Sequence, residues 1–102
     1  MRDRRHRPPH PGAVLRDSRL PALRMSVHEF ADRLQVSRIA FRALLQERRA
    51  LSPDVAVRVA KLLGHSAERW MQRQLALDLW RIAQDPGRVA GIERLARSVV
   101  DD

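Results

Sequence analysis

Residues 26–46 read SVHEFADRLQVSRIAFRALLQ and contain two helical patterns separated by only two or three residues. The first pattern opens with Ser26 and Glu29, a capping box in which the serine hydroxyl accepts from the Glu29 amide and the carboxylate bonds back to the Ser26 amide. The second opens with Ser37, another preferred N-cap. The spacing predicts two short helices joined by a turn at Gln35-Val36. Their predicted inward side chains are Phe30, Ala31, Leu34, Phe41, Leu44 and Leu45.

Two short helices joined by so tight a turn are typical of a helix-turn-helix, whose second helix can lie in the DNA major groove. Ala31 is small enough to let the second helix cross closely over the first. Arginine can bind guanine, glutamine can read adenine and apolar side chains can meet a thymine methyl, so the predicted base-reading residues are Arg38, Ile39, Arg42, Ala43 and Gln46. The predicted phosphate contacts are Arg33, Ser37, Arg48, Arg49 and Ser52. The alternative is a solvated charged face on a helical bundle.

The rest of the chain is also helical in pattern, and the predicted fold is an all-α bundle of five to six helices. A first helix is expected over residues 11–19, with Pro21 stopping it. Ser52-Pro53-Asp54 opens a helix that ends at Gly64, and Ser66 caps another that lasts to about residue 84. The predicted organisation is a flexible basic tail over 1–9, a DNA-binding domain with a dimerisation helix over 10–84, and a C-terminal amphipathic helix over 85–102. That last helix is expected to turn Val89, Ile92, Leu95 and Val99 inward.

The charge of the chain is distributed unevenly. The 102 residues hold 20 Lys and Arg against 12 Asp and Glu, a formal net charge of +8. Residues 1–63 carry 14 basic and 6 acidic side chains, whereas residues 64–102 carry six of each. A basic excess confined to the part that contains the helix-turn-helix pattern favours a nucleic-acid partner. The chain has no apolar run of the roughly 20 residues that a membrane span needs, so a cytoplasmic, nucleoid-associated protein without membrane contact is expected.

The sequence gives no sign of catalysis. It has no cysteine, no zincin motif, no glycine-rich phosphate loop and no nucleophile elbow. His6 and His10 stand four apart, but Pro8 and Pro9 lie between them and argue against a helical metal pair. We therefore expect no enzyme, no catalytic residues, no metal and no cofactor.

Motifs spread over residues 10–82 resemble the HigA antitoxins of the XRE helix-turn-helix class. The most specific are His10-Pro11-Gly12, Leu51-Ser52-Pro53 and a run with Trp70, Gln74 and Asp78-Leu79-Trp80. The others are Leu15, Leu20-Pro21, Ser26, Val36-Ser37-Arg38, Ala56, Ala60-Lys61, Gly64 and Ser66. The resemblance implies a lambda-repressor-like fold and two activities. These are neutralisation of a HigB-type toxin, a RelE-like mRNA endonuclease, and repression of the shared operon by a dimer bound to operator double-stranded DNA.

The chain departs from this family pattern at two turns. Gln35 stands where the family usually has glycine, and Gln46-Glu47 replace an Asn-Gly pair. Gln35 is expected either to adopt a left-handed conformation, at a cost of about 1 kcal/mol, or to belong to a remodelled turn. The operator of a related antitoxin therefore does not predict the operator sequence of this protein. A stand-alone XRE-family transcriptional regulator is the main alternative, and a module that inhibits a toxin without binding DNA is a third.

The helix over residues 66–84 carries two apolar stripes. One consists of Met71, Leu75, Leu79 and Ile82, and the other of Trp70, Leu77 and Trp80. One stripe should pack on the bundle, while the other needs a second contact: the C-terminal helix, a second subunit or the toxin. A homodimer is also expected because one recognition helix reads too few base pairs for useful specificity. The predicted dimer interface is Trp70, Leu77 and Trp80.

Contacts to a toxin are predicted from charge alone. Toxins of the RelE type are usually basic because they bind RNA, so an antitoxin surface should offer carboxylates. Asp17, Glu29 and Asp32 are the candidates, with Glu68 and Asp78 as further ones. The alternative is that these carboxylates are ordinary solubilising charge.

Overall fold

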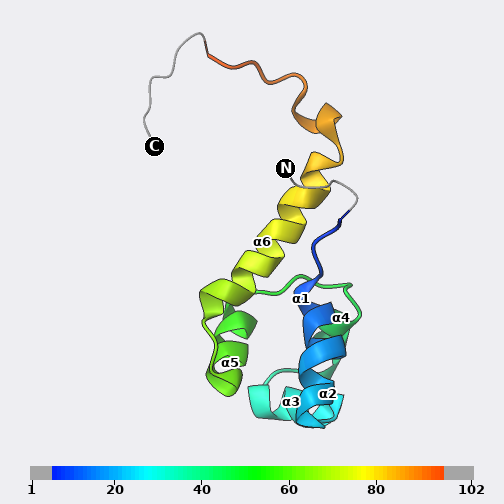
Figure 1. Ribbon diagram of the computed structural model, residues 1–102, viewed down its shortest axis with the longest axis vertical. Helices are drawn as coiled ribbons and strands as arrows, with labels where there is room; N and C mark the ends of the chain where they lie inside the picture. Colours follow the sequence, from blue (N-terminus) through cyan, green and yellow to red (C-terminus); the bar gives the residue numbers. More distant parts are fainter. Residues whose placement is uncertain (1–5, 96–102) are drawn as a thin grey trace.

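The structure is a computed structural model that describes residues 6–95, a bundle of short helices from which one long helix projects (Figure 1). The described residues contain no strand, which confirms the all-α prediction. In chain order the elements are α1 (Pro11–Val14), η1 (Leu15–Arg19), α2 (Leu20–Leu23), α3 (Val27–Leu34), α4 (Arg38–Leu45), α5 (Pro53–Leu63), α6 (Ala67–Ala83) and η2 (Pro86–Val89).

The N-terminal helix continues through the proline that was expected to stop it. The segments α1, η1 and α2 form one helical run over residues 11–23, with η1 wound as a π-helix. In η1 the Leu20 amide donates to the Leu15 carbonyl, five residues back. The wider turn makes room for the Pro21 ring, which has no amide hydrogen to donate and would clash in a regular α-helix. The run ends instead at Arg24, in a left-handed conformation (φ 53°).

The predicted pair α3 and α4 is present with its expected caps. The Ser26 hydroxyl accepts from the Glu29 amide (3.1 Å), and the Ser37 hydroxyl accepts from the Ala40 amide (3.2 Å). Gln35 ends α3 with φ 60° and ψ 43°, so this glutamine takes the left-handed conformation that glycine favours. All six side chains predicted to point inward are buried, namely Phe30, Ala31, Leu34, Phe41, Leu44 and Leu45.

The turn between α3 and α4 is held by a side chain from α5. The Arg58 guanidinium donates from Nη1 to the carbonyl oxygens of Leu34 (3.1 Å) and Gln35 (3.3 Å). These two carbonyls lie at the end of α3, where no further helical amide is available to them. Arg58 thereby supports the strained Gln35 backbone, a role that no local pattern in the sequence had indicated.

Helices α5 and α6 have the predicted boundaries. Ser52 and Ser66 cap their starts by accepting from the amides of Val55 (3.2 Å) and Arg69 (3.1 Å), and Gly64 ends α5 with φ 84°. Trp70, Gln74 and Leu77 are the buried residues of α6. The Gln74 side chain accepts from the Leu51 amide (2.8 Å), which ties α6 to the segment that follows α4.

The predicted C-terminal helix is absent from the described part of its range. Residues 86–89 form the 3₁₀ turn η2, and residues 90–95 have no regular helix. Val89, Ile92 and Leu95 are exposed rather than inward. The extended backbone of Asp85 (φ −124°, ψ 76°) separates η2 from α6, and these apolar side chains pack on no core formed by residues 6–95. The rest of that helix, with Val99, and residues 1–5 of the predicted tail lie outside the described residues.

The hydrophobic core is one cluster at the centre of the bundle. Phe30 of α3 and Phe41 of α4 stack within it with ring centroids 5.4 Å apart. The C-terminal half of α6 extends beyond this bundle, and the chain measures 55 × 29 × 26 Å (Figure 1). Among the described helices none has the length and apolar character to span a bilayer.

Candidate nucleic-acid interface

Helix α4 presents one face to the core and the opposite face to solvent. Phe41, Leu44 and Leu45 anchor it inside the bundle, whereas Arg38 and Arg42 are exposed. Ile39 stands between these two arginines, with 84% of its surface exposed. An isoleucine so exposed has no folding role, because apolar side chains are stabilised by burial. The outer face of α4 therefore combines two guanidiniums with one apolar side chain, as a surface that reads base edges requires.

A shallow hollow lies on this face between α3 and α4. It is lined by His28, Arg38, Ile39, Arg42 and Arg48, and no carboxylate is among its lining residues. Three arginines around one concave surface create a positive potential that attracts phosphates. The sequence had indicated four of these side chains as DNA contacts, and it had missed His28.

Asp32 of α3 holds Arg38 in place through two hydrogen bonds. The guanidinium donates to the two carboxylate oxygens of Asp32 at 2.7 and 3.1 Å. This forked pairing lowers the pKa of Asp32 and raises that of Arg38, so both groups stay charged. The Arg38 side chain is thus oriented by Asp32 of α3.

Arg42 and His28 form a second contact between the same two helices. Arg42 Nη2 lies 3.0 Å from His28 Nε2, and both side chains are exposed. An arginine can only donate, so this contact is a hydrogen bond when the ring nitrogen is unprotonated. Both arginines of the α4 face are therefore supported by side chains from α3.

The remaining predicted base-reading residues lie at the end of α4. Ala43 is half-buried, and Gln46 is the exposed C-cap residue, whose amide oxygen accepts from Arg48 (2.6 Å). Glu47 follows with φ 63°, a left-handed conformation at the position where the family pattern has glycine. Gln46 and Arg48 are thus coupled to one another beside the hollow.

The residues predicted to contact phosphates differ in whether their side chains already bind other groups of the chain. Arg33 pairs with Glu29 (3.3 Å), and this ion pair replaces the second half of the predicted capping box, in which Glu29 was to bond the Ser26 amide. Ser37 and Ser52 use their hydroxyls as helix caps. Arg49 is exposed in the segment between α4 and α5.

The N-terminal segment supports α4 from behind. His10 is 1% exposed and caps α1, because its Nδ1 accepts from the Gly12 amide (2.9 Å). Burial lowers the pKa of His10, chiefly by desolvating the charged form. Gly12 packs directly on the backbone carbonyl of Leu44, so closely that a Cβ there would overlap it. The structural reason for the His-Pro-Gly motif is therefore the close packing of α1 on α4.

Arg16 provides a second link from the N-terminal helix to α4. Its guanidinium donates to the Leu45 carbonyl (2.9 Å), to Glu47 (3.2 Å) and to Asp17 (2.8 and 2.9 Å). The Leu45 carbonyl lies at the C-terminus of α4, where a cation is favoured by the helix dipole. Arg16 thus fixes the end of α4 and the left-handed Glu47, and the sequence had not indicated it.

The predicted dimer interface is wrong for two of its three residues. Trp70 and Leu77 are 2% and 0% exposed within the chain itself, so they offer no surface to a partner, while Trp80 is half-buried. The exposed apolar stripe of α6 consists instead of Leu75, Leu79 and Ile82. Helical periodicity identifies two apolar faces but not which one faces the core, and here the larger tryptophan fills the core.

The three carboxylates predicted to contact a toxin are all exposed. Each is bound to an arginine of its own chain: Asp17 to Arg16, Glu29 to Arg33 and Asp32 to Arg38. Residues 6–95 contain no group of three or more His, Asp or Glu side chains that could hold a metal ion.

Comparison with known proteins gives consistent results. The uncharacterised helix-turn-helix-type transcriptional regulator YbaQ of Escherichia coli K12 is 32% identical over 104 residues, with 95% of this chain and 92% of YbaQ covered. The Pseudomonas aeruginosa antitoxin HigA with the higBA promoter matches with a TM-score of 0.80 and 29% identity, over 89% of this chain and 100% of that chain. Antitoxin GraA in complex with its operator matches with a TM-score of 0.81 and 31% identity, over 90% and 95%.

No profile of a known protein family matches the chain. The similar proteins are antitoxins and transcriptional regulators, which confirms the expectation that the chain is not an enzyme.

Proposed function

Because the chain belongs to the HigA family of helix-turn-helix antitoxins, we propose that it binds operator DNA through the outer face of α4 and represses its own operon as a dimer. The observation that carries this proposal is the exposed trio Arg38, Ile39 and Arg42, which has no role in the core. The two arginines are already oriented by Asp32 and His28. A pre-oriented recognition surface loses less conformational entropy on binding.

The division of work on this surface follows from the chemistry of each side chain. Arg38 and Arg42 would read guanine, and Ile39 would contact a thymine methyl. Arg48 and Arg49, at the edge of the surface, would contact phosphates and so position the protein without reading sequence. The backbone amides at the starts of α4 and α5 would add further phosphate donors.

Titration of fluorescent DNA from the region upstream of the gene tests this assignment. Arg38→Ala and Arg42→Ala should each weaken specific binding by about 1–3 kcal/mol. Arg49→Ala should weaken binding to all sequences and flatten the salt dependence by about one unit. Arg88→Ala, which removes the same charge from the exposed turn η2, is the matched control. Unchanged affinity in all three α4-side variants would remove this face from DNA reading.

The dimer in this proposal forms through the exposed stripe Leu75, Leu79 and Ile82 of α6. The stripe lies on the helix that extends beyond the bundle (Figure 1), and Leu79 is 58% exposed. Burial of such a stripe against its symmetry copy follows the usual two-fold arrangement of repressors. Leu79→Asp should shift the protein to monomer in sedimentation velocity and reduce operator affinity, whereas Gln72→Asp, at an exposed polar position of the same helix, should not. A Leu79→Asp variant that stays dimeric would exclude this stripe.

The second part of the proposal is that the chain neutralises a HigB-type, RelE-like mRNA endonuclease in the cytoplasm. Its support is the family membership. The exposed carboxylates of Asp17 and Glu29 would contact a basic toxin by exchanging their own partners, Arg16 and Arg33, for basic side chains of the toxin. Expression of the neighbouring small reading frame, with and without this chain, provides the test. Growth arrest that this chain relieves supports the proposal; a harmless or unrescued neighbour contradicts it.

A transcriptional regulator without a toxin is the second candidate. The similarity to YbaQ favours this candidate, because YbaQ is named as a transcriptional regulator and the similarity covers 92% of its length. Operator binding would be identical in the two cases, so only the toxin experiment separates them. A gene with no adjoining toxin and intact operator binding would favour the regulator.

A further inference from the structure

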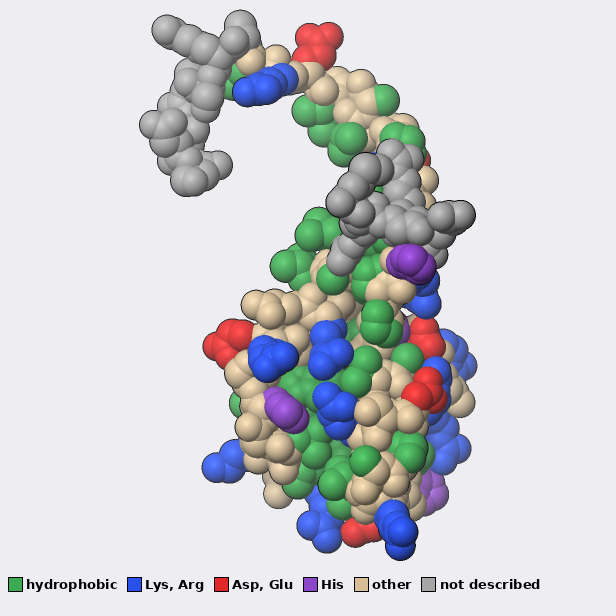
Figure 2. Space-filling view, in the orientation of Figure 1, with side chains coloured by type: hydrophobic (Ala, Val, Ile, Leu, Met, Phe, Trp, Pro, Cys, Tyr) green, Lys and Arg blue, Asp and Glu red, His purple; other side chains and the backbone are tan. Residues whose placement is uncertain are grey.

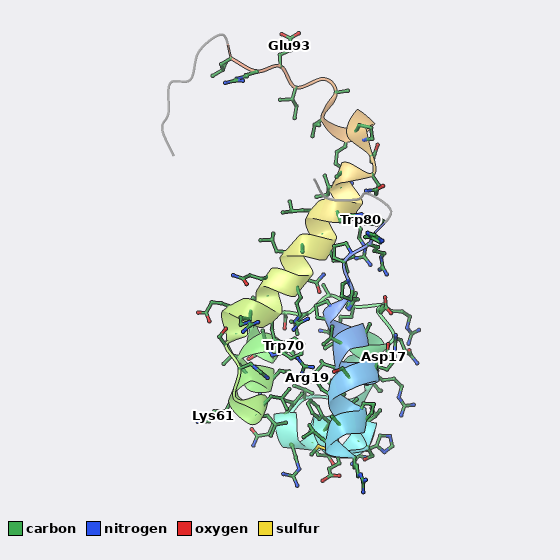
Figure 3. The ribbon with its side chains drawn as sticks, in the orientation of Figure 1. Asp17, Arg19, Lys61, Trp70, Trp80 and Glu93 are labelled. Carbon is green, nitrogen blue, oxygen red and sulfur yellow. The ribbon has the colours of Figure 1, made fainter. Side chains whose placement is uncertain are left out.

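A second basic cluster lies at the start of α6 and shares no residue with the hollow on α4. Arg19, His65, Arg69, Trp70 and Arg73 line a small pocket of about 60 Å³. Figure 2 shows blue side chains and a purple histidine gathered on this face of the molecule, at the base of the long helix. In Figure 3, Arg19 and Trp70 point toward one another across the space between the N-terminal helical run and α6.

Positive charge is concentrated in this pocket without a compensating carboxylate. Two guanidiniums lie over the indole of Trp70, with the Arg19 and Arg73 carbons 5.6 and 5.1 Å from the ring centroid. Within residues 6–95, none of Arg19, Arg69 and Arg73 forms a salt bridge. Burial, followed by the charges of Arg19 and Arg69, lowers the pKa of Arg73. Like charges held this close repel one another, and a bound anion would relieve the repulsion.

Two buried donors in the same pocket also have no acceptor. Arg19 Nε and Trp70 Nε1 are both inaccessible and form no hydrogen bond with the described residues, although Trp70 is 98% buried. The hydrogen bond that Arg19 does form runs from Nη1 to the adjacent Ser18 hydroxyl (2.8 Å). Buried polar groups in folded proteins are nearly always paired. Since both groups can only donate, the partner that would satisfy them is an acceptor.

We infer that the pocket formed by Arg19, Arg69, Arg73 and Trp70 is a binding site for a phosphate group. A cavity volume of about 60 Å³ is several times the roughly 10–15 Å³ that one water needs, so the pocket has room for one oxyanion group. Three guanidiniums match the charge of a phosphate dianion better than that of a single carboxylate. The positive end of the α6 dipole, next to Arg69, adds to the attraction.

The source of the phosphate is either free inorganic phosphate or the terminal phosphate of a small phosphomonoester. Both present the same three oxygens to the pocket, which is open to solvent at the exposed residues His65 and Arg69. The site does not involve α4, so a test of phosphate binding is independent of a test of the proposed DNA binding.

Trp70 provides a direct spectroscopic probe because the chain has only two tryptophans. In a ¹H–¹⁵N spectrum of the full chain in phosphate-free buffer, added inorganic phosphate should move the Trp70 indole proton downfield and saturate at millimolar concentration. Ribose 5-phosphate in a parallel titration distinguishes a phosphomonoester from free phosphate by which of the two binds more tightly. Acetate is the third titrant. A response to acetate as strong as that to phosphate, or no saturable response to either phosphate compound, would overturn the inference.

Variants distinguish specific phosphate binding in this pocket from nonspecific electrostatic attraction of phosphate to a basic protein. Arg73→Leu should weaken the phosphate response by about tenfold or more while leaving the thermal midpoint in phosphate-free buffer unchanged or raised, because it removes a repelling charge. Arg88→Leu, which removes an exposed arginine from η2, should keep the full response. If Arg73→Leu does not fold, Arg69→Gln at the exposed rim serves the same purpose. Full phosphate response in the folded variant would overturn the inference.

Discussion

Gly12 is the position where one added methyl group should reveal how α1 supports the recognition helix. A Cβ built on Gly12 overlaps the carbonyl oxygen and carbon of Leu44 in α4, and it lies 3.2 Å from His10 Nδ1. The first two are backbone atoms, so no side-chain rotation can relieve the overlap. Alanine at this position must therefore push α1 and α4 apart.

The expected cost of Gly12→Ala is the sum of two destabilising contributions and one stabilising contribution. Overpacking in a tight interior costs about 1–3 kcal/mol, and disturbance of the His10 cap on the Gly12 amide costs about 1 kcal/mol. The intrinsic helix preference of alanine returns up to about 1 kcal/mol. The net expectation is a loss of about 1–3 kcal/mol, a considerable share of the roughly 5–15 kcal/mol that stabilises a chain of this size.

Urea unfolding followed by circular dichroism measures this loss, and Gly91→Ala provides the matched control. A Cβ on Gly91 meets no atom within 4 Å, so the same substitution there should leave stability within a few tenths of a kcal/mol. Helix propensity alone predicts that Gly12→Ala stabilises the protein. A Gly12→Ala variant as stable as the wild type, or more stable, would therefore refute the close packing of α1 on α4.

Three further outcomes follow from buried or bridging groups. Burial lowers the pKa of His10 below its usual 6.5, so the folded state favours the neutral ring. The free energy of unfolding should therefore fall as the pH drops below about 6.5, by up to about 1.4 kcal/mol per pH unit. His10→Asn, which keeps a capping oxygen, should flatten this dependence in urea titrations at several pH values. Gln74→Met leaves the Leu51 amide without its acceptor and should cost about 1–3 kcal/mol in the same assay. Arg58→Met removes the bonds that hold the turn after α3 and should cost about 1 kcal/mol, and an unchanged urea midpoint would contradict this bridging role.

Local sequence signals identified most of the helices because their causes are local. Each of Ser26, Ser37, Ser52 and Ser66 caps the helix it was predicted to begin, since a cap satisfies amides two or three residues away. Gly64 ended α5 as predicted for the same reason.

Predictions failed where the backbone departs from regular α-helix geometry or where burial depends on the packing of distant segments. Pro21 did not stop the first helix, because a π-helical turn accommodates its ring. The apolar pattern over residues 88–95 did not produce a helix, and within residues 6–95 no segment covers Val89, Ile92 and Leu95. Helical periodicity alone could not establish that Trp70 rather than Leu79 faces the core.

The helix-turn-helix and the basic outer face of α4 could be predicted from the sequence, because caps, periodicity and charge are properties of neighbouring residues. The contacts that hold this face depend on how the helices pack: Asp32 and His28 contribute from α3, and Arg16 and Gly12 from the N-terminal run. Packing of the helices also brings the guanidiniums of Arg19 and Arg73 within 5.6 and 5.1 Å of the centroid of the Trp70 ring. These groups are distant in sequence and come together only when the helices pack, so no local pattern could indicate them.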